Sequence, residues 1–150
     1  MEIMQVQSGE YSISTDRDKL DLDLIHIFLS NTYWAKGIPR STVERSLQHS
    51  LCFGLYHEQQ QTGFARVITD YTTFAYLADV FIIPSYRGKG LSKWLVKTIL
   101  EHPELQGLRR WMLATADAHG LYTRFGFTPL PHPERFLQIH YPDVYKQTHP

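Results

Sequence analysis

The sequence predicts a single α+β domain, and three observations support this prediction. The chain has 150 residues, the length of one ordinary domain. Hydrophobic residues make up 43% and charged residues 20%, a balance typical of a globular chain that can bury a core. Strand-like and helix-like stretches alternate along the chain, without an internal repeat, a low-complexity segment or a linker.

The N-terminal third predicts a first strand and a first helix. Residues 11–15 alternate between apolar and polar side chains, as in a half-buried strand. Asp21 and Asp23 precede the apolar residues 24–29, and acidic side chains are favoured near the positive end of a helix. The Gly-Ile-Pro sequence at residues 37–39 then predicts a break between this helix and the next element.

A second short helix and a hairpin follow this break. Ser41 is the predicted N-cap, with Glu44 three residues later in capping-box spacing. Residues 51–56 and 63–69 have the composition of strands, and the polar stretch 57–62 between them suits a hairpin turn.

The longest apolar run, residues 74–83, predicts a central strand covered on both faces. Asp79 is the only charged residue in this run. Pro84 ends the strand, and the apolar spacing predicts a helix that starts at about Leu91 and ends before Pro103.

The last third of the chain predicts a strand, a short helix and closing strands. Residues 110–115 have strand-like composition. Residues 118–125 predict a short helix that Gly126 stops. Phe127 and residues 136–141 are expected to supply the closing strands.

The segment between the long strand and its following helix is suited to binding an anion. Gly88 and Gly90 tolerate positive φ and let a ligand approach the backbone closely. The first N–H groups of a helix lack partners and favour an anion, and Arg87 and Lys89 add positive charge. The pattern is neither a Walker loop nor a complete Rossmann fingerprint. It predicts a pyrophosphate site, with a tight turn carrying two solvated cations as the alternative.

Two motifs resemble the GNAT superfamily of acyl-CoA-dependent N-acyltransferases. Residues 87–92, Arg-Gly-Lys-Gly-Leu-Ser, resemble its acyl-CoA-binding motif Gln/Arg-x-x-Gly-x-Gly/Ala, with Ser92 in place of the last Gly/Ala. Residues 118–127 resemble its second motif, a short helix carrying Leu-Tyr and closed by Gly-Phe. The order of predicted elements also matches. The resemblance implies a mixed, mostly antiparallel central sheet flanked by helices, and acetyl-CoA as co-substrate.

The resemblance also implies which residues contact acetyl-CoA. In this family, two neighbouring strands separate and pantetheine lies in the gap between them. By this resemblance, the strand at residues 74–83 is the first of the two. The main-chain groups of Val80, Phe81 and Ile82 are expected to pair with pantetheine. Thr115 stands where the family often has an asparagine that contacts it. The pyrophosphate is expected on Arg87, Gly88, Lys89, Gly90, Leu91 and Ser92.

Tyr122 matches the position at which many family members keep a tyrosine near the CoA sulfur as general acid. A phenol with an ordinary pKa of ~10 can protonate a leaving thiolate whose pKa is ~8.5. The alternative for Tyr122 is an aromatic ring that packs the short helix onto the sheet.

Asp79 is the candidate general base, because burial in an apolar strand would raise its pKa. Alternatively it pairs with a nearby arginine, or faces away from the cleft. Strand alternation puts it on the opposite face from Ala78 and Val80 unless a bulge intervenes. His119 is a second candidate base, whereas Asp117 is expected to be the N-cap of the short helix.

The first two helices and their connecting loop usually help to form the acceptor site in this family. Tyr33 and Trp34 could stack on a flat or cationic acceptor, and Arg40 could hold a carboxylate. Phe74 and Tyr76 are expected to extend the same wall. An aromatic helix end packed on the sheet is the alternative interpretation.

These residues predict direct transfer of an acetyl group from acetyl-CoA to a small-molecule or peptide amine in a ternary complex. Cys52 lies away from both motifs, so a route through a cysteine is not expected. A non-catalytic acyl-CoA sensor is the alternative, and a nucleotide-binding protein is a weaker third interpretation.

Composition restricts the partners and the location. Fifteen basic and fifteen acidic residues balance, which argues against a general nucleic-acid binder. No stretch approaches the ~18 apolar residues that span a bilayer. A single cysteine and a polar N-terminus predict a cytoplasmic protein. No metal site is expected, because the histidines form no ligand spacing. A homodimer is compatible with the resemblance.

Overall fold

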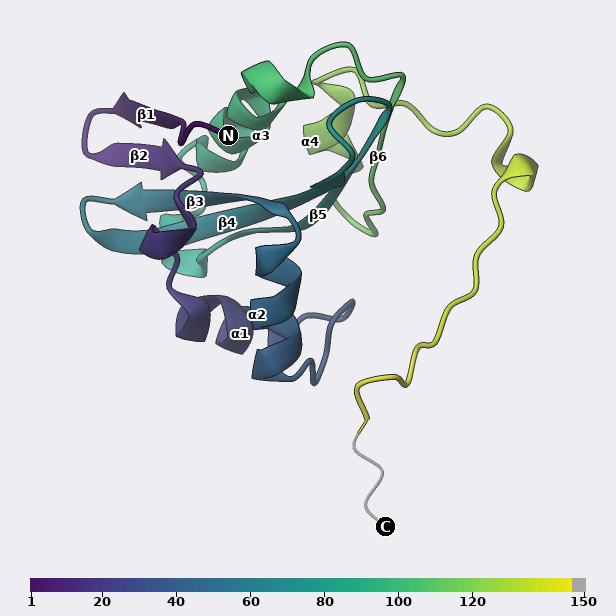
Figure 1. Ribbon diagram of the computed structural model, residues 1–150, viewed down its shortest axis with the longest axis horizontal. Helices are drawn as coiled ribbons and strands as arrows, with labels where there is room; N and C mark the ends of the chain where they lie inside the picture. Colours follow the sequence, from purple (N-terminus) through teal and green to yellow (C-terminus); the bar gives the residue numbers. More distant parts are fainter. Residues whose placement is uncertain (147–150) are drawn as a thin grey trace.

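One mixed sheet of six strands, in the order β1-β2-β3-β4-β5-β6, forms the centre of the fold (Figure 1). The structure is a computed structural model that describes residues 1–146. Neighbouring strands are antiparallel, except that β5 and β6 are parallel, which confirms the predicted mostly antiparallel sheet. The strands are β1 (Gln5–Ser8), β2 (Tyr11–Ser14), β3 (Leu51–His57), β4 (Gln60–Thr69), β5 (Phe74–Ile82) and β6 (Arg110–Met112).

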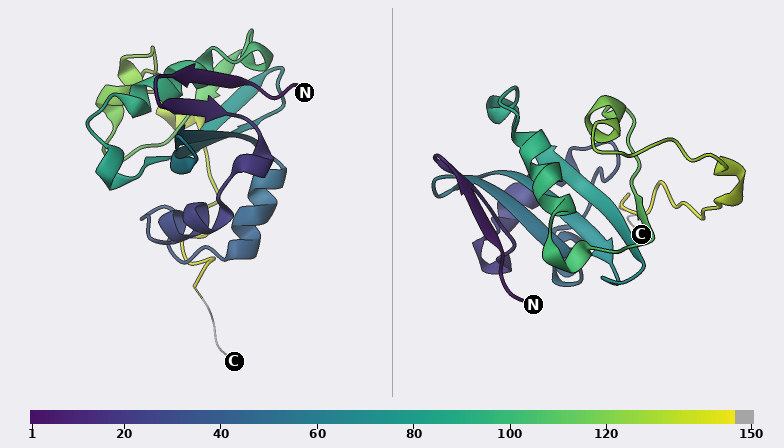
Figure 2. Two further views of the ribbon diagram at one scale, coloured as in Figure 1. Left: turned by 90° about the vertical axis from the view of Figure 1, so that its left-hand side faces the viewer. Right: turned by 90° about the horizontal axis from the view of Figure 1, so that it is seen from above.

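Helices cover both faces of this sheet (Figure 2). The helices are α1 (Leu22–Ser30), α2 (Arg40–Gln48), α3 (Leu91–Leu100) and α4 (His119–Thr123). One face carries α1 and α2, and the other carries α3 with α4 beside it. Within residues 1–146, no helix has the length and apolar character needed to cross a membrane.

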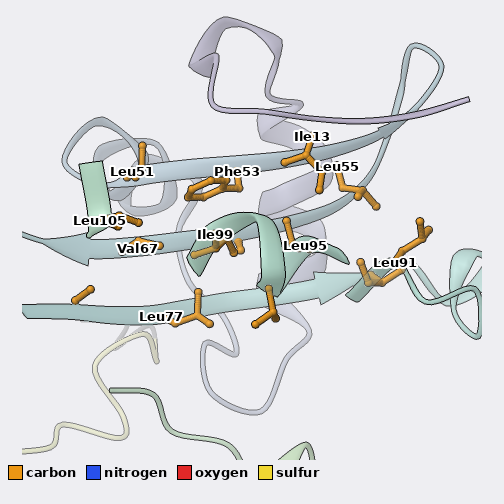
Figure 3. Packing of buried hydrophobic residues seen from close by; sticks show 14 of the residues in the cluster. Ile13, Leu51, Phe53, Leu55, Val67, Leu77, Leu91, Leu95, Ile99 and Leu105 are labelled. Carbon is orange, nitrogen blue, oxygen red and sulfur yellow. The ribbon is translucent and has the colours of Figure 1, made fainter. Parts of the chain in front are cut away.

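The core consists of two apolar clusters, one on each face of the sheet. Under α3, Leu95 and Ile99 pack among side chains of β3, β4 and β5, including Phe53 (Figure 3). On the other face, Ile25 of α1 and Val43 of α2 are fully buried among residues of the sheet. Burying a large aliphatic side chain stabilises a fold by about 1.5–3 kcal/mol, so both helix layers are firmly held to the sheet.

The N-caps of two helices differ from the prediction. The N-cap of α2 is Pro39 rather than Ser41, because the proline already has a φ of −66° and its carbonyl accepts the N–H of Val43 at 3.1 Å. The N-cap of α4 is Ala118 rather than Asp117. No side chain caps this helix; the N–H of Ala118 itself donates to the Thr115 hydroxyl at 3.0 Å.

The N-terminal strand β1 was not predicted, because most of its side chains are exposed and it has no apolar face of its own. It forms by pairing with β2 through a tight turn, in which Gly9 has a φ of +60°. The predicted strand at residues 110–115 is shorter than expected, since β6 ends at Met112.

The predicted closing strands at Phe127 and residues 136–141 are not formed. The chain after α4 runs as an extended arm away from the sheet (Figure 1, yellow-green). Prolines at alternate positions through 129–133 remove the N–H groups that a strand would donate, which explains why pairing does not begin there. The arm returns to the α1–α2 region, where Tyr145 packs against the second apolar cluster.

Candidate functional site

The two parallel strands β5 and β6 part after three paired residues, and a cleft opens between them. The last pair is Tyr76 opposite Met112. Beyond it, the remainder of β5 and residues 113–118 line a cleft of about 830 Å³. The gap between strands that the resemblance implies is therefore present, with α4 at one wall and the end of α1 at another.

A β-bulge at Asp79 turns this residue into the cleft. Arg66 of β4 pairs with Ala78, and Phe64 pairs with Phe81, so Asp79 and Val80 oppose one residue of β4. Asp79 adopts a φ of +56°, which is uncommon for a residue with a side chain. The bulge reverses the alternation of side chains along β5. The Asp79 side chain therefore lines the cleft, and does not face away from it.

Asp79 bonds two neighbours through its two carboxylate oxygens. The Arg66 Nε donates to Oδ2 at 2.9 Å, and the Trp34 Nε1 donates to Oδ1 at 2.8 Å. The ion pair is largely shielded from solvent, since the side chains of Arg66 and Asp79 are 17% and 10% exposed. Arg66 also donates to the Ser50 hydroxyl at 3.0 Å. The arginine-paired alternative considered above is therefore the one that the structure shows, although Asp79 also lines the cleft.

The Gly-rich loop lies at one end of the cleft. Gly88 and Gly90 have φ values of +79° and +77°, and Gly90 is the N-cap of α3. A Cβ built on either glycine would have no heavy atom within 4 Å, so the backbone here is open to a ligand. Arg87 donates from Nε to the Ile82 carbonyl at 2.9 Å, which joins the loop to the end of β5.

The flanks of this loop line the cleft, and its middle is exposed beside it. Arg87 and Ser92 are lining residues, whereas Lys89 is exposed outside the lining. The side chain of Leu91 belongs to the core instead, where it is 7% exposed. Only main-chain groups of Leu91 are therefore free to face a ligand.

Tyr122 reaches the cleft from α4 and is 8% exposed. Burial raises the pKa of its hydroxyl to about 12, with smaller contributions from the charges of Asp117 and Tyr33. The hydroxyl therefore stays protonated at neutral pH. Its ring packs edge-on against Phe127 at 5.9 Å between centroids, so packing and a cleft position coexist in this residue.

Aromatic residues line a further part of the cleft. Tyr33 and Trp34 line the cleft from the chain after α1, and Tyr76 lines it from β5. The Tyr33 hydroxyl accepts the N–H of Ala116 at 3.2 Å, which links the two sides of the cleft.

Two residues expected on the acceptor wall lie elsewhere. Arg40 is outside the cleft lining and forms an exposed ion pair with Asp23 at 2.9 Å. It begins α2, and its side chain reaches back to the first turn of α1. Phe74 starts β5 at the end where β5 and β6 are still paired, so it does not reach the cleft.

The structure adds lining residues that the sequence did not indicate. Phe28 lies parallel to Phe81, with ring centroids 3.9 Å apart. Phe28 and Thr32 are four residues apart, so helical spacing could have placed them on one face. Leu77 and Ala78 belong to β5, and the remaining residues depend on the path of the chain after β6, which no local pattern gives. The added residues are Phe28, Thr32, Leu77, Ala78, Leu113, Ala114, Ala116, Asp117, Ala118 and Leu121.

Among residues 1–146, one group of side chains that could bind a metal lies outside the cleft lining. Glu10, His57 and Glu58 have potential ligand atoms within 4.8 Å of one another. The two ring nitrogens of His57 are already engaged, at 2.9 Å from Glu10 and at 3.0 Å from the Tyr86 hydroxyl. These contacts account for the position of His57 beside Glu10.

Comparison with known proteins identifies the family and agrees with the fold. Residues 21–127 match the model of the acetyltransferase (GNAT) family. A curated Gibberella zeae protein assigned to the acetyltransferases is 36% identical, over 76% of each chain. A crystal structure of a GNAT-family protein from Xanthomonas campestris is 52% identical, with a TM-score of 0.89 over 91% of this chain and 97% of the other.

A Clostridium acetobutylicum structure with acetyl-CoA shares the fold at 13% identity, with a TM-score of 0.58 over 91% of this chain and 96% of the other. Its low identity makes it evidence for the fold alone. The family match and the two closer relatives together show that this chain belongs to the GNAT family of acetyltransferases and is an acyl-transferring enzyme.

Proposed function

We propose that the enzyme transfers an acetyl group directly from acetyl-CoA to a primary amine in a ternary complex. One observation carries this proposal: Tyr122 lines the same cleft as the start and end of the Gly-rich loop, and its hydroxyl is protonated at neutral pH. A protonated phenol and an anion-binding loop in one cleft suit a reaction in which a thiolate departs.

The Gly-rich loop and β5 are the proposed binding site for acetyl-CoA. The open backbone at Gly88 and Gly90, with Arg87 and Lys89 beside it, fits a pyrophosphate at the start of α3. Leu91 and Ser92 would contribute the next N–H groups. Pantetheine would lie along Val80, Phe81 and Ile82, with Thr115 across the cleft. The Thr115 hydroxyl accepts the Ala118 N–H, which leaves its own proton to donate.

Tyr122 is the proposed general acid. As the amine nitrogen bonds to the acetyl carbon and the carbon–sulfur bond breaks, the Tyr122 hydroxyl protonates the departing sulfur. Within residues 1–146 this hydroxyl has no hydrogen-bond partner, so no competing contact holds its proton.

Asp79 is the proposed base, acting through a water molecule. A carboxylate oxygen has two lone pairs, so each oxygen of Asp79 can accept a further bond beside those from Arg66 and Trp34. His119 is the weaker candidate, because it is exposed and outside the cleft lining.

Cys52 argues for direct transfer. Its side chain is 1% exposed, and burial raises the pKa of the thiol to about 11. It is also outside the cleft lining. A buried protonated thiol is a poor nucleophile, so an acetyl-cysteine intermediate is not part of the proposal.

The proposal is tested first by thermal unfolding with acetyl-CoA, free CoA and ATP. A ligand at ~100 times its dissociation constant adds about 2.7 kcal/mol of stability. For a domain of this size, that raises Tm by roughly 5–10 °C. Acetyl-CoA and CoA should raise Tm and ATP should not. A rise with ATP alone would indicate the nucleotide-binding alternative, and no rise with millimolar acetyl-CoA would refute the site.

A matched pair of variants locates the binding site on the loop. Lys89→Ala should weaken the acetyl-CoA shift by removing a charge beside Gly88 and Gly90. Lys97→Ala removes the same charge from α3, where Lys97 pairs with Glu101 at 3.4 Å, and should leave the shift unchanged. Equal effects of the two variants would show that the loop does not hold the ligand.

We also propose a homodimer built through the C-terminal arm. Leu137, Ile139 and Tyr141 alternate along the arm and are 96%, 83% and 70% exposed. β6 is the last strand of the sheet, and its outer edge is unpaired within residues 1–146. The arm of a second copy would supply a strand there. Light scattering should give twice the chain mass at micromolar concentration, and a monomer for Leu137→Ser/Ile139→Ser. A monomeric parent protein would refute the arrangement.

A further inference from the structure

The part of the cleft next to Tyr33 and Trp34 has unusual chemistry for a binding surface on a small domain. Both rings are large and apolar, yet Tyr33 is 66% exposed and Trp34 is 45% exposed. They meet edge to face, with centroids 5.1 Å apart. Phe28 and Tyr76 line the same cleft. Exposed aromatic rings gathered at a cleft are typical of a ligand surface rather than a core.

Hydrogen bonds hold these two rings in place from both sides of the cleft. Trp34 donates its indole N–H to Asp79 of β5 at 2.8 Å. Tyr33 accepts the N–H of Ala116, in the segment between β6 and α4, at 3.2 Å. A pre-ordered aromatic wall needs little reorganisation when a ligand binds, which favours affinity for a flat group.

Three charged side chains line the cleft: Asp79, Arg87 and Asp117. Asp79 is neutralised by Arg66, and the exposed Asp117 forms no ion pair within residues 1–146. Asp117 and Tyr33 are close enough to Tyr122 for their charges to raise its pKa. Arg87 is the one arginine or lysine among the described lining residues, and its Nε is bonded to Ile82 at the loop.

The one arginine or lysine in the described lining therefore belongs to the Gly-rich loop, and none comes from the segment that carries Tyr33 and Trp34. Arg40, which could have paired with an acceptor carboxylate, is bonded to Asp23 outside the cleft. A carboxylate beside the reacting amine would meet Asp117 without a compensating cation, and like charges at an interface are costly. An ammonium group would instead be attracted by Asp117 and by the faces of the aromatic rings.

We propose that the acceptor is an arylalkylamine, a primary amine on an aromatic skeleton without an adjacent carboxylate. This inference rests on the proposed function and names the substrate class of the same cleft. The amine arrives as an ammonium ion and loses a proton. Its nitrogen then bonds to the acetyl carbon as the carbon–sulfur bond breaks. The products are an N-acetylated amine, CoA thiol and one proton released to solvent.

Pairs of acceptors that differ in one group test the two parts of this inference. Tyramine and tyrosine differ in the carboxylate alone, and tyrosine methyl ester replaces that charge by a neutral group of similar size. We expect kcat/KM for tyramine to exceed that for tyrosine by about ten- to a hundredfold, with the methyl ester close to tyramine. Hexylamine tests the ring, and it should be at least about fivefold poorer than tyramine.

Two charge-reversal variants test whether Asp117 causes the preference for tyramine over tyrosine. In Asp117→Lys the preference for tyramine over tyrosine should fall at least about tenfold, while the Tm shift with acetyl-CoA stays unchanged. Glu44→Lys makes the same charge change on an exposed position of α2 and should leave the preference as it was. Because Asp117 caps no helix, its replacement is not expected to disturb the fold.

The outcomes separate this inference from the proposed function. Tyrosine turned over as well as tyramine would overturn the carboxylate part, and hexylamine equal to tyramine would overturn the aromatic part. A normal acetyl-CoA shift with no turnover of any of these amines would overturn the substrate class while leaving the cofactor site intact. The absence of an acetyl-CoA shift would refute the proposed function itself.

Discussion

Replacing Tyr122 by phenylalanine isolates the proton that the proposed mechanism requires. The variant keeps the ring, its contact with Phe127 at 5.9 Å between centroids and nearly all of its buried area. It removes a hydroxyl that has no hydrogen-bond partner within residues 1–146, so no partner is left unsatisfied. The free energy of unfolding should therefore change by less than about 0.5 kcal/mol, and Tm by less than about 2 °C.

The expected loss of kcat in Tyr122→Phe is much larger than the expected change in its free energy of unfolding. A positioned general acid contributes about 10²- to 10⁴-fold to a rate, which corresponds to about 2.7–5.4 kcal/mol of activation free energy. We expect kcat of Tyr122→Phe to fall by this factor, with the Tm shift from acetyl-CoA retained. The assay follows release of CoA thiol with tyramine, and with any faster amine found by screening.

The pH dependence adds a second check on Tyr122. Because its pKa is raised from 10.0 to about 12, the phenol is protonated throughout the neutral and mildly alkaline range. Its loss as an acid should therefore lower kcat only as pH rises toward 12, and the parent enzyme should show no alkaline decline from this group below about pH 10. If Tyr122→Phe retains kcat within twofold, the tyrosine is a packing residue and the acid assignment is refuted.

Two further predictions concern the strand and the loop. Asp79→Asn keeps an acceptor for Trp34 but leaves the shielded Arg66 unpaired, which should cost about 1–3 kcal/mol and lower Tm by roughly 3–10 °C in thermal unfolding. If Asp79 is also the base, kcat should fall by about 10²- to 10⁴-fold; an unchanged kcat would leave it a purely positioning residue. Gly90→Ala forces a side chain into a φ of +77° and should cost about 1–2 kcal/mol without a steric clash. Gly120→Ala, inside α4 and equally unobstructed, is the matched control and should be neutral or stabilising; equal losses in both would argue against left-handed strain at Gly90.

Local patterns predicted most of the architecture because they report burial directly. The continuous apolar run at β5 and the amphipathic spacing of α3 gave both elements to within about two residues of their bounds. Gly88 and Gly90 marked the loop, since their positive φ values are ones that other residues avoid. Elements without an apolar face of their own, such as β1, could not be predicted in this way.

The sequence identified several residues of the candidate site, but it did not predict which residues they contact. Tyr122, Asp79 and Trp34 were each selected from local context, and all three line one cleft. The prediction that Arg40 lines the acceptor site was wrong. Its sequence position shows that it is near α1, but not that it forms an ion pair with Asp23. The arginine that does reach the site region, Arg66, lies on β4 and showed no signal of its own.

The sequence by itself determined the fold class, the family and the position of the Gly-rich loop, since these depend on local patterns and on their order along the chain. Tertiary structure decided what faces the cleft. The bulge at Asp79 depends on how β5 pairs with β4, and one extra residue reverses which side chains point inward. The ties from Trp34 to Asp79 and from Tyr33 to Ala116 span 45 and 83 residues. Such contacts exist only once distant segments are brought together, so no local pattern can encode them.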